Sequence, residues 1–150
     1  MPPPSISFRL VPNVRQGSGR AVGMLGGHQD LCANTLINLK EKDAKYMRYS
    51  MDRWSSGIDG PNARCHPFPG TDYFVFKQVA EGHRFYGYLY HPLPKTNPRF
   101  LLCVLTTYAQ KREDKTDPAD LGRVKQWMNA PASKAAISVV YADKEPEKKG

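Results

Sequence analysis

The sequence predicts a single α+β domain built on a small antiparallel sheet with a mixed edge. Two strand-like runs separated by a short turn, within residues 71–92, predict a hairpin. An amphipathic segment over 31–56 predicts a helical region packed on one face of the sheet. The pair Asp117–Pro118 predicts the start of a short C-terminal helix. The 150 residues are enough for one domain with a core, with residues 1–150 forming that domain around a core of about 31–130.

Composition indicates a globular, basic protein. Hydrophobic residues make up 40% of the chain, and 22 Lys and Arg against 14 Asp and Glu give a formal charge of +8. This balance favours a polyanionic partner such as nucleic acid. The three cysteines form no CxxC pair, and no apolar run approaches the length of a membrane span. We therefore expect a cytoplasmic protein without disulfides, metal or other cofactor, and without a membrane partner.

The N-terminal half predicts one strand and a helical region. Alternation over residues 6–10 predicts a first strand, and the five glycines within 12–30 predict a loop. The helical region is expected to be one long helix, or two joined near Lys42 and Asp43. Residues 57–70 are expected to connect it to the sheet.

The C-terminal half predicts the rest of the sheet and the last helix. The apolar run 99–108 predicts a central strand covered on both faces. A helix is expected over 118–129, closed by Pro131. Ile137, Val139 and Tyr141 predict a last short strand, and residues 142–150 predict a disordered charged tail.

Strand alternation divides the hairpin side chains between two faces. One is expected to be a core face and consists of Phe74, Phe76, Phe85 and Leu89. The other carries cations and rings, namely Tyr73, Lys77, Arg84, Tyr86 and Tyr88. Cations neutralise phosphates and rings stack on unpaired bases, at about 1–3 kcal/mol each. The second face therefore suits single-stranded RNA, unless the tyrosines only cover the sheet.

Further candidate residues follow the third strand and flank the turn. Tyr108, Lys111 and Arg112 add a phenol and two cations just past the strand end. His83 has a reference pKa suited to proton transfer, but alternation places it on the face opposite Arg84. The chain has no His-Glu-x-x-His motif or carboxylate cluster at metal-ligand spacing, which disfavours a metal-dependent nuclease.

Two segments resemble the RelE/ParE toxin superfamily. VFKQVAEGHRFYGYL resembles the lysine, turn, Gly-x-Arg and aromatic strand of RelE-type ribonucleases. FLLCVLTTYAQKREDKTDPADLGRV resembles the apolar strand, basic pair and Thr-x-Pro helix start of phage-derived HigB-like toxins. The resemblance covers about residues 36–128 and implies a RelE-like fold.

The resemblance implies the toxin of a type II toxin–antitoxin system. Such toxins are metal-independent endoribonucleases that cleave mRNA, usually on the ribosome, and are held inactive by a cognate antitoxin protein. By resemblance, Lys77 matches a catalytic or RNA-binding lysine, and Arg84 matches the arginine that stabilises the transition state. Arg112 matches a second phosphate-contacting arginine, with Lys111 beside it. The reaction is attack of the ribose 2′-hydroxyl on the adjacent phosphate.

The proton donor and acceptor stay open, because the tyrosine that RelE-type enzymes carry beyond the basic pair has no match after Arg112. His66, His83 and Tyr108 are the candidates. Two other functions also stay open. One is a ParE-like inhibitor of DNA gyrase that cuts no RNA, and the other is a basic RNA-binding protein without catalysis. The oligomeric state is not predicted.

Overall fold

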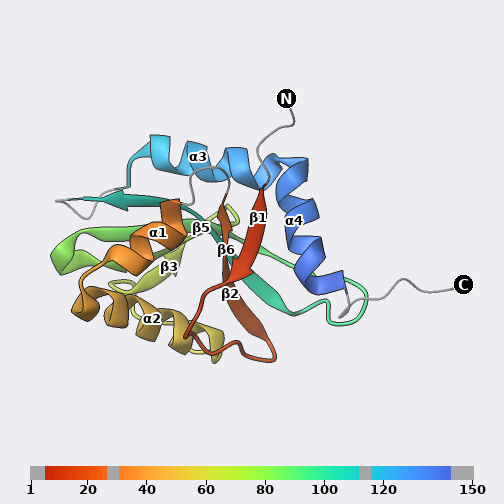
Figure 1. Ribbon diagram of the computed structural model, residues 1–150, viewed down its shortest axis with the longest axis horizontal. Helices are drawn as coiled ribbons and strands as arrows, with labels where there is room; N and C mark the ends of the chain where they lie inside the picture. Colours follow the sequence, from red (N-terminus) through yellow and green to blue (C-terminus); the bar gives the residue numbers. More distant parts are fainter. Residues whose placement is uncertain (1–5, 27–30, 112–115, 143–150) are drawn as a thin grey trace, which may run out of the picture.

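The computed structural model describes residues 6–26, 31–111 and 116–142, and these form a mixed sheet with helices on both faces (Figure 1). Its described strands are β1 (Ser7–Leu10), β2 (Arg20–Gly26), β3 (Cys65–Pro67), β4 (Tyr73–Gln78), β5 (His83–Tyr90) and β6 (Leu101–Gln110). Its described helices are α1 (Leu31–Asn38), α2 (Glu41–Ser55), α3 (Pro118–Asn129) and α4 (Pro131–Tyr141), with a single 3₁₀ turn, η1 (Val79–Glu81). The α+β class is confirmed. Within the same residues, no helix is long and apolar enough to cross a membrane.

The sheet has the strand order β1-β2-β6-β5-β4-β3. Neighbouring strands are antiparallel except β2 and β6, which run parallel with Ala21 opposite Leu102 and Met24 opposite Leu105. The predicted hairpin is the β4–β5 pair. β6 lies between β2 and β5, in the interior of the sheet, which explains why its sequence is apolar at nearly every position.

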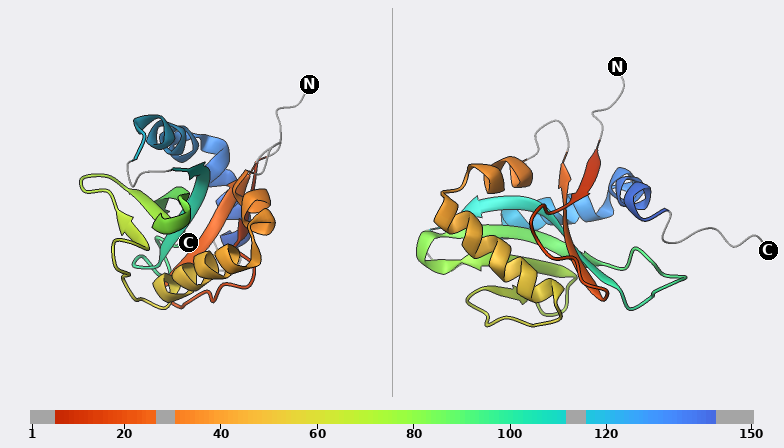
Figure 2. Two further views of the ribbon diagram at one scale, coloured as in Figure 1. Left: turned by 90° about the vertical axis from the view of Figure 1, so that its left-hand side faces the viewer. Right: turned by 60° about the horizontal axis from the view of Figure 1, so that its bottom comes forward.

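Helices α1 and α2 cover one face of the sheet, as the sequence predicts (Figure 2). The break between the two helices lies at residues 39–40, a few residues before the joint expected near Lys42 and Asp43. Their core residues include Leu36, Met47, Met51 and Trp54. The apolar side chains of α2 recur at helical spacing, so one face of the helix is buried and the opposite face meets solvent. We call this side of the sheet the α2 face.

Helices α3 and α4 cover the other face, which we call the α3 face. Helix α3 has the predicted bounds, and the side chain of Asp117 caps it by accepting from the Ala119 N–H at 2.9 Å. The strand predicted at 137–141 is wrong, since these residues end α4. Pro131 starts that helix instead of only closing α3, and Ser133, Ala136, Ile137 and Tyr141 form its buried stripe.

The loop predicted over 12–30 is wrong at its centre, where β2 forms. Val22 and Met24 are buried on the α2 face, whereas Ala21 and Leu25 are buried on the α3 face, so the strand shows no polar alternation. A Cβ on Gly23 would lie 2.2 Å from the Phe8 ring, which accounts for a glycine inside this strand.

Two other expectations about segments have mixed outcomes. The connector predicted over 57–70 contains the short strand β3. The tail prediction for 142–150 falls, apart from Ala142, outside the described residues, as does the end of the predicted loop at 27–30.

The β4–β5 turn depends on Gly82. This residue has φ +79°, which favours glycine, and a Cβ on it would lie 2.0 Å from the Lys111 carbonyl oxygen. The Lys111 N–H donates to the Gly82 carbonyl at 2.8 Å. The hairpin turn and the end of β6 are thereby held together, which brings the candidate functional residues to one end of the sheet.

Candidate functional site

Three predicted cations gather on the α3 face at this end of the sheet, and we call Lys77, Arg84 and Lys111 the cationic cluster. Lys77 and Arg84 are directly opposite each other on β4 and β5, and Arg84 is opposite Ala109 on β6. Lys111 follows two residues beyond Ala109. The three side chains therefore come from three neighbouring strands and lie on the predicted common face.

The predicted exposure of this face is wrong. Relative exposure is 6% for Lys77, 2% for Arg84, 1% for Tyr86 and 3% for Tyr88. Tyr86 and Tyr88 belong to the core that also contains residues of α3 and α4. Tyr73 is half-buried and packs at the edge of the same core. The sequence assigns these residues to one face correctly, but alternation cannot show that two later helices cover that face.

Arg84 has a structural role at the turn. Its Nη1 donates to the carbonyl oxygens of His83, at 3.1 Å, and Gln78, at 3.4 Å. These acceptors flank η1, so the guanidinium ties the two strands together where the hairpin closes. Removal of Arg84 should therefore cost stability as well as any effect on function.

Lys111 faces the first turn of α3. Its Nζ lies 2.8 Å from Asp120 Oδ2 and 3.8 Å from Asp117 Oδ2. The hydrogen bond to Asp120 and the charges of both carboxylates raise the pKa of Lys111. Asp120 is buried and also accepts from Arg123 Nη1 at 2.8 Å. A buried carboxylate thus pairs directly with Lys111.

The Tyr86 hydroxyl lies among these charges. Burial raises its pKa, while a hydrogen bond with Thr116 and the charges of Arg84 and Lys111 act in the opposite direction. A phenol kept protonated beside cations can donate a proton to a developing oxyanion. The structure therefore places a proton-carrying group beside the cationic cluster that the sequence assigned only to base stacking.

The α2 face carries a second polar group, the histidine network of Asp43, Gln78, His83 and Tyr108. Gln78 Nε2 donates to Asp43 Oδ1 at 3.0 Å, and His83 Nε2 lies 3.4 Å from Asp43 Oδ2. Because a carboxylate only accepts, Nε2 carries a proton, and Nδ1 lies 2.6 Å from the Tyr108 hydroxyl. Burial opposes ionisation of Asp43, but the hydrogen bonds from Gln78 and His83 outweigh it, and its pKa is lowered.

A β-bulge explains why Tyr108 belongs to this network. Tyr86 is opposite Thr107, whereas Gly87 is opposite Leu105, so Thr106 is the extra residue on β6. Leu105 and Tyr108 consequently share the α2 face although they are three positions apart. Without the bulge, Tyr108 would lie on the same face as Arg84.

The predicted catalytic residues are therefore divided between two faces. His83 lies opposite Arg84, as alternation predicts, and its network with Tyr108 is separated from the cationic cluster by the sheet. His66 lies away on β3, opposite Val75, where its Nδ1 contacts the Pro67 carbonyl oxygen at 2.9 Å. The prediction for Arg112 falls outside the described residues.

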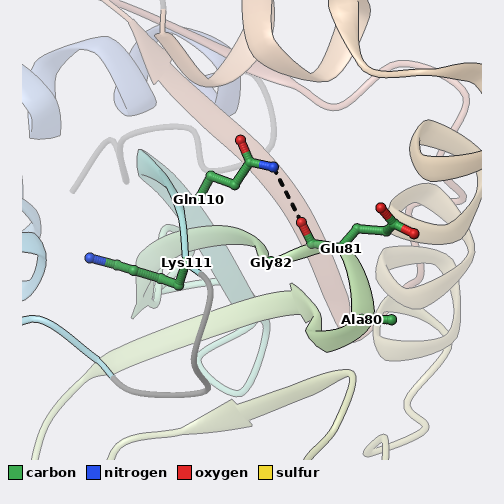
Figure 3. Close-up of a pocket in the computed structure, with 5 residues that line it drawn as sticks. All are labelled: Ala80, Glu81, Gly82, Gln110 and Lys111. Carbon is green, nitrogen blue, oxygen red and sulfur yellow. Dashed lines mark hydrogen bonds between the residues drawn. The ribbon is translucent and has the colours of Figure 1, made fainter.

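A pocket of about 520 Å³ opens at the end of the hairpin and reaches one member of the cationic cluster. Its described lining residues are Ala80, Glu81, Gly82, Gln110 and Lys111 (Figure 3). Gln110 Nε2 donates to the Glu81 carbonyl at 3.3 Å, and Figure 3 shows the Lys111 and Glu81 side chains pointing in opposite directions. Lys111 thus lines the pocket and also contacts α3, which makes it the most accessible cation of the cluster.

Sequence reasoning missed two carboxylates, Asp43 and Asp120. Each lies in the first turn of a helix, where an acidic residue is common for reasons of helix stability alone. Nothing in the sequence at these helix positions indicated that Asp43 would contact His83 or that Asp120 would contact Lys111. Within the described parts of the chain, no group of three or more His, Cys, Asp or Glu side chains is arranged to hold a metal ion.

Comparisons with known proteins give no match: no family model, no curated protein and no solved structure matches this chain. The function is therefore argued from the site itself.

Proposed function

We propose that this chain is the toxin of a type II toxin–antitoxin system, a metal-independent endoribonuclease that cleaves mRNA on the ribosome in the cytoplasm. Its partners in this proposal are mRNA, the ribosome and a cognate antitoxin protein. The proposal rests on the resemblance described above and on one observation of geometry. That observation is the convergence of Lys77, Arg84 and Lys111 from three neighbouring strands, with the Tyr86 hydroxyl beside them.

The cationic cluster suits cleavage by the 2′-hydroxyl. The 2′-oxygen attacks the adjacent phosphorus and the bond to the 5′-oxygen breaks, leaving a 2′,3′-cyclic phosphate and a 5′-hydroxyl. Lysine and arginine donors stabilise the extra negative charge of the five-coordinate transition state. The Tyr86 hydroxyl would give its proton to the leaving 5′-oxygen, and the proton of the 2′-hydroxyl would pass to water.

Lys77 and Arg84 are buried, so RNA would reach them only after a rearrangement on the α3 face, where α3 packs against β5 and β6. The carboxylate of Asp120 occupies the place beside Lys111 that a phosphate would take. The described arrangement is accordingly a closed one, in which an internal acid satisfies the cation. The His83 and Tyr108 side chains, on the other face, take no part in the proposed chemistry.

The test is induced expression in bacteria with primer-extension mapping of transcripts. Wild type should arrest growth and give new cuts inside translated messages. Lys111→Ala and Tyr86→Phe should lose the cuts, whereas Lys134→Ala, which removes an exposed cation from α4, should keep them. Melting temperatures of the purified variants show that the loss is not unfolding. Cuts that persist in both Lys111→Ala and Tyr86→Phe contradict the proposed site.

A ParE-like inhibitor of DNA gyrase is the second candidate, and the burial of Lys77 and Arg84 favours it. Buried cations that hold a turn are compatible with a binding fold that performs no chemistry. Growth arrest without transcript cuts, together with inhibition of gyrase in a supercoiling assay, would select this function. Absence of arrest would select a basic RNA-binding protein.

A further inference from the structure

The outer face of α2 carries a row of exposed and half-buried cations and tyrosines. Lys42, Lys45, Tyr46, Tyr49 and Arg53 recur at helical spacing, opposite the buried stripe of the same helix. Arg64, from the segment before β3, lies against this row. We call these six residues the tyrosine–arginine stripe.

Two guanidinium groups of the stripe lie against its two aromatic rings. The Arg64 guanidinium lies 4.6 Å from the Tyr46 ring centroid and 5.3 Å from that of Tyr49. The Arg53 guanidinium lies 5.5 Å from the Tyr49 centroid, and its Nη1 donates to the Tyr49 hydroxyl at 3.2 Å. Each contact is within cation–π range and fixes flat groups on the surface of a helix.

The stripe is open to solvent at Tyr49, while Tyr46, Arg53 and Arg64 are half-buried. Tyr49 is 51% exposed, although a tyrosine is amphipathic and usually buries its ring. The nearby carboxylates compete only weakly with a polyanion for the cations of the stripe. Glu41 pairs with Lys45 at 3.3 Å, but both side chains are at least 70% exposed, and such surface pairs are weak. The Asp52 carboxylate accepts from the Arg15 backbone N–H.

We infer that the tyrosine–arginine stripe is a binding surface for unpaired RNA. Bases can stack on Tyr49 and on the guanidinium planes, while Lys42 and Lys45 neutralise the neighbouring phosphates. A duplex keeps its bases stacked inside and offers no free ring for such a row. The inference stands apart from the proposed cleavage, because α2 lies on the face of the sheet opposite the cationic cluster.

The test is fluorescence anisotropy with a labelled, unstructured 2′-O-methyl oligonucleotide of about ten residues, matching the reach of a stacking groove. Such an RNA cannot undergo 2′-hydroxyl attack, so failure of the proposed cleavage leaves this result unchanged. Tyr49→Ala and Arg64→Ala should each weaken binding about tenfold, while Tyr49→Phe, which keeps the ring, should stay within about twofold of wild type. Lys45→Ala should lower the slope of log affinity against log salt by about 0.7.

Two matched controls make the result decisive. Lys134→Ala removes one exposed positive charge elsewhere and should bind as wild type does, and a duplex competitor should displace the probe poorly. The inference is overturned if Tyr49→Ala and Arg64→Ala bind like Lys134→Ala. It is also overturned if duplex RNA or polyglutamate competes as well as unlabelled unpaired RNA, since the surface would then recognise charge alone.

The unpaired RNA could belong to the message or to the ribosome, and sedimentation separates these sources. If the Tyr49→Ala variant no longer sediments with vacant ribosomes, the stripe binds ribosomal RNA. If it fails to sediment only with ribosomes that carry message, the stripe binds the message. If the variant sediments with both at wild-type affinity, the inference is overturned.

Discussion

The two faces of the sheet differ at the end where the hairpin closes, although neighbouring residues of one strand supply both. On the α2 face, His83 lies in a network that pairs its donors and acceptors with Asp43 and Tyr108. On the α3 face, Arg84 lies with Lys77 and Lys111, and a carboxylate of α3 balances the most exposed of these cations. The imidazole of His83 and the guanidinium of Arg84, which are adjacent in sequence, are thus separated by the thickness of a sheet.

This difference teaches that proximity in sequence does not define a site on a β-strand. His83 and Arg84 are consecutive, yet their side chains point into different cores. In the α2-face network, Asp43 accepts from Gln78 and lies 3.4 Å from His83. On the α3 face, Lys111 pairs with Asp120 of a helix that follows the sheet in the chain, and it also lines a pocket. The second face therefore holds its accessible cation through a partner from another element.

Insertion of one alanine between Thr107 and Tyr108 should break the comparison most strongly. The extra residue shifts the end of β6 by one position, which moves Tyr108 to the α3 face and Ala109 to the α2 face. We expect the free energy of unfolding to fall by about 3 kcal/mol or more, because buried side chains exchange faces. Thr106→Ala keeps the register and should cost only about 1 kcal/mol. Equal losses in denaturant titrations of the two variants would show that the register of β6 does not fix the faces.

Arg84→Ala should lower stability by about 2 kcal/mol, since two backbone carbonyls at the turn lose a charged donor. Urea unfolding measures the effect, with the exposed Lys134→Ala as the matched charge control. A variant as stable as wild type would mean that Arg84 does not hold the turn.

Tyr108→Phe should cost about 1 kcal/mol, the usual contribution of a hydrogen bond, because the contact between the Tyr108 hydroxyl and His83 Nδ1 is lost. The effect is confined to the α2 face, so the pairing of Lys111 with Asp120 should persist. Urea titration gives the stability, and the chemical shifts of the Lys111 side chain give the pairing. A shift change at Lys111 as large as that at His83 would show that the two faces are coupled.

Asp43→Asn should change the acid dependence of stability by the smallest amount. The folded-state pKa of Asp43 is lowered, so its contribution is present above its unfolded pKa and disappears as pH falls through the folded value. Wild type should therefore lose stability below about pH 4. Asp43→Asn should lose less over that range, whereas Tyr108→Phe, which keeps the carboxylate, should retain the wild-type slope. Parallel slopes for wild type and Asp43→Asn would contradict this role.

The sequence predicted those helices and strands that are marked by a pattern within their own residues. The hairpin, the central strand β6 and the capped helix α3 follow from alternation, apolar length and the Asp117–Pro118 pair. Strand β2 was missed because it is buried on both faces and contains close-packed glycines, which resemble loop residues. Helix α4 was predicted as a strand because Ile137 and Tyr141 are spaced four apart, which fits both periods.

The sequence predicted which residues belong to the candidate site, but it did not predict how their side chains are arranged. Alternation assigned Lys77, Arg84 and Tyr86 to one face. The bulge at Thr106 and the carboxylate of Asp120 depend on long-range packing, which no local pattern carries. The sequence thus predicted which strands matter, and only tertiary structure divided their side chains into two environments.

The most direct test of the account compares RNA cleavage by Lys111→Ala and Tyr108→Phe, one variant from each face, in purified form with ribosomes and message. If the α3 face performs the reaction, Lys111→Ala should lower the cleavage rate by about a hundredfold or more, the usual effect of losing a donor to a transition-state oxyanion. Tyr108→Phe, at a temperature where both variants are folded, should cleave within about twofold of wild type, because its hydroxyl lies across the sheet. Loss of cleavage in Tyr108→Phe with wild-type cleavage in Lys111→Ala would contradict the account and assign the reaction to the histidine network.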